Sequence, residues 1–341
     1  MKGITHMPNI MLTYRCNLHC SYCFANEFVN KEKTDISIRN FLKAIDFVTR
    51  AGETRVGLIG GEPTLHPGFS VMMEMLTVQP MVSGVSLYTN GLLLERFIPQ
   101  ITHPKVRILV NCNSPQIIGE KAFACLQHNL DLLMTQHDMK NRMTLGINLY
   151  SDDMDYSYMM GLLQRYDLHR VRISLTVPDF SECGEVNVLA YFKERKKFLM
   201  EFFRKMDSIQ VVPNYDCNFP PHCIWTDEEK KWLEEYTGRY STSNLTSECS
   251  RCSPVIDILP DLQAVRCFGM SDYMKVPIAD FRHVPDLINY FKNEIDSVAY
   301  KLPGCPECRG CYEQKVRKCI TGCMGYKTSR IRSGNKAVAQ L

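Results

Sequence analysis

Strand-like and helix-like segments alternate regularly over the first two thirds of the chain, and this alternation restricts the possible folds more than any other feature. Short apolar runs are each followed by a segment whose apolar residues recur every three to four positions. The expected strands cover residues 9–14, 55–59, 85–88, 106–110, 143–150 and 171–177. The expected helices cover residues 37–51, 68–78, a short stretch before 106, 120–136, a stretch capped by Asp152 or Asp153 that ends near 165, and 189–206. Six such units predict a parallel α/β sheet with right-handed crossovers. Because six units do not close an eight-stranded barrel, we expect an open or partial barrel.

The regular alternation of expected strands and helices ends at about residue 210. Residues 211–225 are rich in proline and are expected to be irregular, residues 226–240 are expected to form a short charged helix, and beyond residue 248 the periodicity fades. Eight of the sixteen cysteines lie in this last part, where we expect a small core held together by bound metal. The predicted organisation is a barrel over residues 1–210, a bridging segment over 211–247, an irregular cysteine-rich domain over 248–330 and a basic tail over 331–341.

Charge and hydropathy indicate the compartment and the partners that we expect for this protein. The formal net charge is only +3, so composition favours neither nucleic acid nor an anionic membrane as a partner. No apolar run reaches the roughly 18 residues that a membrane span needs, and the first residues lack the pattern of a signal peptide. We therefore expect a cytoplasmic protein, in which closely spaced cysteines bind metal more often than they form disulfides. From residue 309 onward eight Lys and Arg face a single acid, which indicates either a solvated tail or an anchor for an acidic partner.

Three cysteines follow the first expected strand within eight residues. The spacing of Cys16, Cys20 and Cys23 lets one loop present three thiolates to three irons of a cubane cluster, which leaves the fourth iron open for a substrate or cofactor. His19 is a less favoured fourth ligand, because it sits beside Cys20 in a tight loop. A zinc site usually shows two Cys or His pairs separated by a longer loop, and a disulfide framework does not suit the expected compartment.

This loop and a second motif resemble those of the radical S-adenosylmethionine (SAM) superfamily. In that family a CxxxCxxC loop follows the first strand of a partial (β/α)6 TIM-like barrel and carries an aromatic residue before its last cysteine, where this chain has Tyr22. A Gly-Gly-Glu-Pro motif after the second strand is matched by Gly60, Gly61, Glu62 and Pro63. The resemblance implies that SAM binds the open iron of a [4Fe–4S] cluster through its amino and carboxylate groups. It also implies that the glycines allow close packing of the methionine moiety, and that Glu62 accepts a hydrogen bond from the ammonium.

Polar residues at the ends of the later strands are further candidates for SAM contacts. Asn111 resembles the family position that holds the ribose or carboxylate, and Arg172 is the expected partner of the SAM carboxylate. The full set is Thr89, Asn90, Asn111, Asn113, Asn148, Arg172 and Ser174. The alternative for each of them is ordinary strand-end polarity or a structural salt bridge.

The C-terminal cysteines resemble the SPASM extension of this superfamily, which holds two auxiliary [4Fe–4S] clusters. Three departures stand out: Leu262 replaces the expected glycine, the interval before Cys319 is two residues longer, and no cysteine follows Cys323. We expect Cys305 to take the missing place. The expected ligand sets are Cys305, Cys308, Cys311 and Cys319 for one cluster, and Cys249, Cys252, Cys267 and Cys323 for the other. A zinc module is the alternative, because CxxC pairs suit zinc equally well.

The remaining cysteines carry weaker predictions. Cys217 and Cys223 in the bridging segment, and Cys112 at the end of the fourth strand, could join a cluster or donate a hydrogen atom. Cys125 and Cys183 are expected to be buried small apolar residues.

The resemblance implies an oxidoreductase that cleaves SAM to methionine and a 5′-deoxyadenosyl radical, which abstracts a hydrogen from the substrate. Relatives with the extension most often modify ribosomally made peptides or proteins, by thioether or carbon–carbon cross-linking, epimerisation or oxidation to formylglycine. We expect such a peptide maturase, with an electron donor such as flavodoxin or ferredoxin, and a separate protein or the barrel surface for peptide recognition. The alternatives are a dehydrogenase of a sugar or aminocyclitol, an RNA-modifying enzyme without a recognisable RNA-binding module, and a non-catalytic iron–sulfur or zinc-binding protein. The Gly-Gly-Glu-Pro motif argues against the last of these.

Overall fold

The computed structural model describes residues 7–31, 34–177, 186–240, 243–245, 252–271 and 273–332. Its contacts divide the chain into two compact units. The first unit comprises Met1–Gly146 and Pro254–Phe291, and the second comprises Ile147–Ser253 and Lys292–Leu341. The boundaries expected from the sequence stay a prediction.

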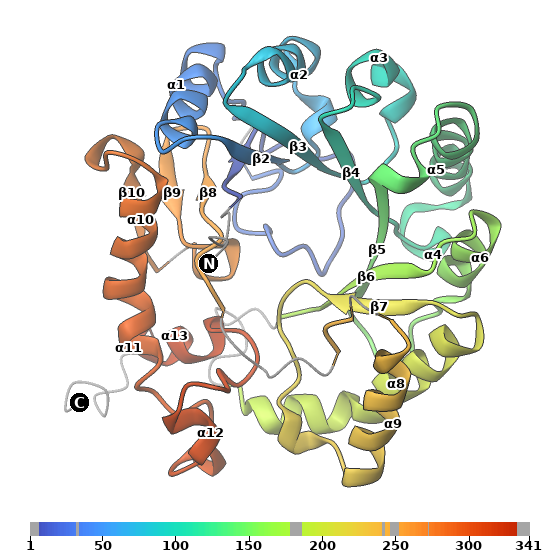
Figure 1. The fold of residues 1–341 in the computed structure, drawn as a ribbon, viewed down its shortest axis with the longest axis vertical. Helices are drawn as coiled ribbons and strands as arrows, with labels where there is room; N and C mark the ends of the chain where they lie inside the picture. The colour runs from blue at the N-terminus through green and yellow to red at the C-terminus, as the bar shows by residue number, and fades with distance from the viewer. Residues whose placement is uncertain are drawn as a thin grey trace. The chain divides into compact units, whose positions relative to one another are not determined.

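The first unit is built on a mostly parallel sheet (Figure 1). Its strands lie in the order β10-β9-β8-β1-β2-β3-β4-β5, and every neighbouring pair is parallel except β8 with β9 and β9 with β10. They are β1 (Asn9–Met11), β2 (Thr54–Ile59), β3 (Val82–Thr89), β4 (Val106–Asn111), β5 (Met143–Leu149), β8 (Asp257–Ile258), β9 (Gln263–Val265) and β10 (Lys275–Pro277). The last three residues of β5 belong to the second unit. The linear strand order leaves the sheet unclosed, which confirms the expected open α/β fold.

Helices follow the strands of this unit as the periodicity predicts. In Figure 1, α1, α2 and α3 lie outside β2, β3 and β4. The helices are α1 (Ile38–Thr49), α2 (Phe69–Val78), α3 (Ile98–Ile101), α4 (Pro115–Ile118), α5 (Glu120–Asp131) and α10 (Val284–Phe291). In α1 the buried residues include Phe41, Ala44, Ile45 and Val48, and the Ser37 side chain caps its first turn. The helices therefore cover a core of fully buried strand residues, among them Val56, Leu58, Val85, Leu87, Val106 and Val110.

The second unit contains a parallel strand pair and several helices. Its elements are α6 (Ser157–Arg165), β6 (Arg170–Leu175), α8 (Val188–Ser208), β7 (Val212–Tyr215), α9 (Asp227–Gly238), α11 (Ser297–Ala299), α12 (Tyr312–Lys315) and α13 (Gly325–Arg332). A capping box between Thr226 and Glu229 starts α9. None of the helices in the described part of the chain is long and apolar enough to cross a membrane.

Three expectations about secondary structure are wrong. The proline-rich stretch expected to be irregular contains β7, in which Pro213 lies opposite Val171 of β6; proline is tolerated at the edge of a sheet because no partner there needs its N–H. The cysteine-rich part also supplies β8, which pairs with β1 and is too short to show a periodicity. Helix α6 begins at Ser157, whose N–H donates to Asp155 at 2.8 Å, so neither Asp152 nor Asp153 caps it.

Candidate active site

Cys16, Cys20 and Cys23 lie in the loop after β1, and each is half-buried. The Cys23 N–H donates to the Cys20 carbonyl at 3.1 Å, which places these two cysteines on one tight turn. The Cys16 Sγ accepts a hydrogen bond from the Leu18 N–H at 3.4 Å. Burial above all raises the pKa of the Cys16 thiol to about 12, and it also raises the pKa of Cys20 and of Cys23. Three neighbouring thiols of this kind need a bound cation to become thiolates together.

An ion pair anchors the start of this loop. The Arg15 guanidinium donates to both carboxylate oxygens of Asp35, at 3.0 and 2.8 Å, and to the Leu65 carbonyl at 2.8 Å. The Thr13 hydroxyl donates to the same carboxylate at 2.6 Å. On the other side, the Asn30 side-chain oxygen accepts from the Cys16 N–H at 2.8 Å. A bidentate arginine pair fixes orientation as well as distance, so the backbone is held on both sides of the first cysteine.

Replacing Asp35 by asparagine is expected to destabilise the protein by about 1 kcal/mol, because Arg15 loses its charged acceptor while water screens part of the pair. The two side chains are 34% and 29% exposed. Asp46→Asn is the matched control, since Asp46 pairs with Arg50 on an exposed helix face and should cost at most about 0.5 kcal/mol. Urea unfolding of both variants measures the difference, and equal losses would contradict the anchoring role.

The Gly-Gly-Glu-Pro turn packs directly on the cysteine loop. The Gly61 N–H donates to the Thr13 carbonyl and the Glu62 N–H donates to the Arg15 carbonyl, both at 2.8 Å. A Cβ atom on Gly61 would lie 2.3 Å from the Arg15 carbonyl oxygen, and one on Gly60 would lie 2.9 Å from that of Thr13. Only glycine allows the two loops to approach this closely. The contact of these glycines with SAM stays a prediction.

Glu62 joins the ends of two strands. Its side chain is fully buried: Oε1 accepts from the Thr64 N–H at 3.2 Å and from the hydroxyls of Thr64 and Thr89 at 2.6 and 2.8 Å, and Oε2 accepts from the Asn90 N–H at 2.8 Å. Burial raises the pKa of Glu62, and these hydrogen bonds offset part of that rise. A cation beside this carboxylate would favour its ionised form. Pro63 follows as the first residue of a short 3₁₀ helix, Pro63–Leu65.

Two amide side chains connect the third and fourth strands to the cysteine loop. Asn90 donates from Nδ2 to the Asn17 side-chain oxygen at 2.7 Å. The Tyr22 hydroxyl donates to the Asn113 side-chain oxygen, which also lies 3.9 Å from the Cys20 Sγ. Residues expected at the site from β1, β2, β3 and β4 therefore come together at the carboxyl ends of these strands, where barrel active sites form. Asn111 is half-buried at the last position of β4.

In the second unit Arg172 is already paired. Its Nη1 donates to the Asn148 side-chain oxygen at 2.9 Å, and its Nη2 lies 2.5 Å from the Asp216 carboxylate. This is the structural salt bridge that the sequence left open as an alternative. The expected contact of Arg172, Asn148 and half-buried Ser174 with SAM stays a prediction.

The C-terminal cysteines are divided between the units. Cys267 follows β9 in the first unit, and Cys252 belongs to the second. Cys305 and Cys308 are buried with their sulfur atoms 3.3 Å apart. Cys311, Cys319 and Cys323 are half-buried. Cys249 and Cys183 lie outside the described residues.

The single cysteines differ in exposure. Cys112 is buried, which raises the pKa of its thiol to about 12, and Cys217 is exposed. The expectation that Cys125 is buried is wrong: it is exposed on α5, and its thiol donates to the Leu92 carbonyl at 3.3 Å. The residues around Cys125 are both polar and apolar, so the sequence pattern alone does not show which face of the helix it occupies.

The donor set of the first loop fits an iron–sulfur cluster. Across the residues that the structure describes, no three His, Cys, Asp or Glu side chains converge closely enough to hold a single metal ion. A cubane spreads its thiolates over separate irons, so its ligands stand farther apart than those around one tetrahedral ion. Three half-buried thiols on one loop, fixed by Arg15 and Asn30, match that requirement.

Several residues of the site were not predicted from the sequence. Asn17, Asn30, Asp35 and Asp216 belong to no motif. Their partners lie far along the chain, so no local pattern points to them.

Comparison with known proteins agrees with this site. Residues 10–133 match the family model of the Radical SAM superfamily. The molybdenum cofactor biosynthesis protein moc-5 of Caenorhabditis elegans is 35% identical over 103 residues, which are 30% of this chain and 17% of that protein. A GTP 3',8-cyclase of Clostridium perfringens is 32% identical over 96 residues, which are 27% of this chain and 29% of that protein. The match thus spans less than a third of either relative.

Solved structures show the same fold at low identity. SuiB of Streptococcus suis bound to S-adenosylmethionine has a TM-score of 0.53 and 12% identity, covering 85% of this chain and 66% of that one. SuiB bound to the precursor peptide SuiA has a TM-score of 0.54 and 12% identity, covering 85% and 65%. At this identity the likeness shows the fold alone. The cysteine loop, the Gly-Gly-Glu-Pro turn and the family match together show that residues 10–133 carry a Radical SAM domain, within an α/β fold whose parallel sheet is not closed.

Proposed function

We propose that the protein is a radical SAM enzyme that abstracts a hydrogen from a peptide or protein and thereby installs a post-translational modification. The observation that carries the proposal is the packing of the loop with Cys16, Cys20 and Cys23 against Gly61 and Glu62 within the Radical SAM domain. With SAM and a [4Fe–4S] cluster bound and reduced, such a site supplies a 5′-deoxyadenosyl radical. The modification is a thioether or carbon–carbon cross-link, an epimerisation or a formylglycine-type oxidation.

The residues of this chain would divide the work as follows. Cys16, Cys20 and Cys23 hold three irons and leave the fourth for SAM. Glu62, buried beneath the Gly-Gly turn, attracts the SAM ammonium, and its raised pKa would fall when that cation binds. Asn113 orients Tyr22 against the cysteine loop.

A peptide substrate is supported by two observations. The fold resembles that of SuiB, a protein solved with a precursor peptide. The eight C-terminal cysteines suit two auxiliary [4Fe–4S] clusters of the SPASM type, which accompany peptide-modifying members of the superfamily. An electron donor such as flavodoxin or ferredoxin would supply the electron, and a separate protein would help to recognise the peptide.

A nucleotide substrate is the second candidate. The sequence relatives named GTP 3',8-cyclase favour it, although they match only 27% of this chain. A match of that length leaves most of the chain uncompared.

The two candidates are separated by substrate-dependent turnover. Anaerobically reconstituted protein is incubated with dithionite, SAM and either GTP or the peptides encoded by short reading frames beside its gene. We expect a peptide to accelerate 5′-deoxyadenosine formation and to change by the loss of two hydrogens or by uptake of solvent deuterium. Conversion of GTP with no effect of any peptide would replace the peptide proposal with the nucleotide one.

A further inference from the structure

A turn segment over residues 24–30 continues the loop of the first three cysteines and returns to its beginning. The Asn26 N–H donates to the Cys23 carbonyl at 3.1 Å, so the segment starts on the last cysteine of the loop. It ends at Asn30, whose side-chain oxygen accepts a hydrogen bond from the Cys16 N–H at 2.8 Å. Whatever fixes the turn segment therefore also fixes both ends of the cysteine loop.

Two aromatic side chains of the turn segment pack against Phe268, a residue of the same unit that lies far along the chain. The ring centroids of Phe24 and Phe268 are 5.3 Å apart, and those of Phe28 and Phe268 are 5.9 Å apart, both in an edge-to-face arrangement. Phe24 directly follows Cys23, and Phe268 directly follows Cys267. The contact therefore joins two segments that each carry a cysteine.

Glu27, in the middle of the turn segment, is held by two residues that follow Phe268. Its Oε2 accepts from the hydroxyl of buried Ser271 at 2.5 Å, and its Oε1 accepts from Lys275 Nζ at 3.1 Å. The same Nζ lies 4.6 Å from the centroid of the Phe28 ring, as a cation–π contact. Each oxygen of the Glu27 carboxylate thus has its own partner, which fixes the direction of the side chain as well as its position.

The pair of Glu27 and Lys275 also places two opposite charges close to the first cluster loop in the chain. Glu27 is four residues beyond Cys23, and the two side chains are only 38% and 37% exposed, so water screens their charges in part. A carboxylate near an iron–sulfur cluster disfavours its more negative, reduced state, and an ammonium favours it. The contact should therefore affect the reduction potential of the cluster, and its packing should affect how firmly the cluster is held.

We propose that Glu27 is a positioning residue of the first-cluster site and that Ser271 and Lys275 hold it in place. The two residues that hold Glu27 lie outside residues 10–133, the part of the chain that matches the Radical SAM family model. The proposal deepens the proposed function, because it rests on a cluster bound by the first three cysteines, and it does not depend on which substrate is used.

Iron retention is the first test. The full chain is reconstituted anaerobically beside a triple alanine variant that lacks the first three cysteines, and the difference between the two gives the iron and the EPR signal of the first cluster. Glu27→Ala should speed the loss of this iron to a chelator about tenfold. Glu27→Gln should restore most of the retention, because its amide oxygen still accepts from Ser271. Glu53→Ala is the matched control, since Glu53 is an exposed glutamate of the same unit, and it should change nothing.

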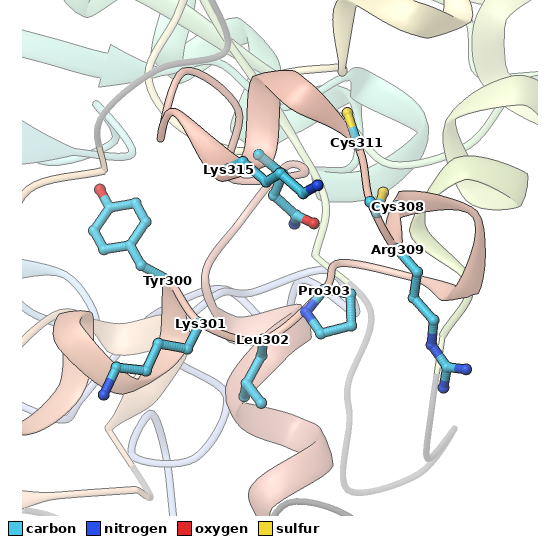
Figure 2. Close-up of a pocket in the computed structure, with 10 residues that line it drawn as sticks. Tyr300, Lys301, Leu302, Pro303, Cys308, Arg309, Cys311 and Lys315 are labelled. Atoms are coloured by element: carbon cyan, nitrogen blue, oxygen red, sulfur yellow. The ribbon is translucent and has the colours of Figure 1, made fainter. Parts of the chain in front are cut away.

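The reduction potential of the first cluster is the second test. Glu27→Gln should raise it because a negative charge is removed, and Lys275→Met should lower it because a positive charge is removed. A loosened loop alone would shift the potential in the same direction in both variants. Lys301→Met is the control and should leave this potential unchanged. Lys301 belongs to the second unit, where it lines a cavity of about 240 Å³ with Cys308 and Cys311, and its side chain extends away from both sulfur atoms (Figure 2).

Three outcomes would overturn the proposal. These are equal rates of iron loss from the wild type and Glu27→Ala, potential shifts of the same sign in Glu27→Gln and Lys275→Met, and loss of iron when Glu27→Ala is added to the triple alanine variant. Circular dichroism checks that each variant is folded. Because no step of the test uses SAM, the expected iron counts and potentials without SAM cleavage would contradict only the proposed function. SAM cleavage with no effect of either Glu27 variant would contradict only the role of Glu27.

Discussion

Replacing Cys20 by alanine is expected to remove the first cluster and to abolish SAM cleavage, the largest effect that a single substitution should have in this protein. A cubane bound by three cysteines already has one iron without a protein ligand. Without Cys20, only two of its four irons keep a cysteine ligand. Iron content should fall from roughly twelve to about eight per chain if both auxiliary clusters are present. Iron analysis and EPR of the reduced, reconstituted protein measure the change.

Cys125→Ala is the control for this substitution. Cys125 is exposed on α5, away from the cysteine loop in sequence, and its thiol donates a hydrogen bond to the Leu92 carbonyl. Its loss should therefore leave iron content and EPR unchanged. If Cys20→Ala retained the full iron content and the spectrum of the wild type, the assignment of the first cluster to this loop would be wrong.

Replacing Gly61 by alanine should have the second largest effect. The new Cβ would meet the Arg15 carbonyl oxygen at 2.3 Å and its carbon at 2.6 Å, and these are backbone atoms that cannot rotate away. The Gly-Gly-Glu-Pro turn must then separate from the cysteine loop, which breaks the hydrogen bond between the Glu62 N–H and the Arg15 carbonyl. We expect a loss of about 3 kcal/mol in the free energy of unfolding, together with a changed EPR spectrum of the first cluster.

Gly161→Ala is the matched control, because the same replacement of glycine by alanine should stabilise the protein there. Gly161 lies in α6, and a methyl group added there would have no atom within 4 Å, so alanine should stabilise the helix by about 0.5–1 kcal/mol. Urea unfolding of the two variants compares them directly. Equal free energies of unfolding for both would show that the close contact at Gly61 is not needed.

The sequence predicts the barrel part of the fold well because its signals are local. The apolar residues of α1 recur within one helix, and the strands that precede each helix are continuous apolar runs, so neither depends on distant partners. The strand β8 has only two residues, and it forms because β1 offers an unpaired edge. No periodicity can be read from a strand of that length.

Leu262 stands where the SPASM pattern has a glycine, and its φ is positive. The glycine expected at this place implies a backbone conformation that other residues adopt rarely, and Leu262 has a φ of 69° in the turn between β8 and β9. The turn is closed by the Leu262 N–H donating to the Leu259 carbonyl at 2.9 Å. Leu262 therefore has a backbone conformation that glycine adopts more readily.

Only those residues of the candidate site that belong to a motif could be predicted from the sequence. Cys16, Glu62 and their neighbours come from two short motifs, whereas Asn17 and Asp35 act through partners that only the folded chain brings near. The sequence could not reveal that Gly61 faces the Arg15 backbone either, because that contact joins two loops about 45 residues apart.

If this Radical SAM domain cleaves SAM reductively, the protein forms 5′-deoxyadenosine from SAM. Wild-type protein is reconstituted anaerobically, its cluster is verified by EPR, and it is then incubated with dithionite and SAM. We expect 5′-deoxyadenosine and methionine in equal amounts, and neither product from Cys20→Ala. An intact, reducible cluster that yields no 5′-deoxyadenosine, with or without a peptide or GTP, would contradict it.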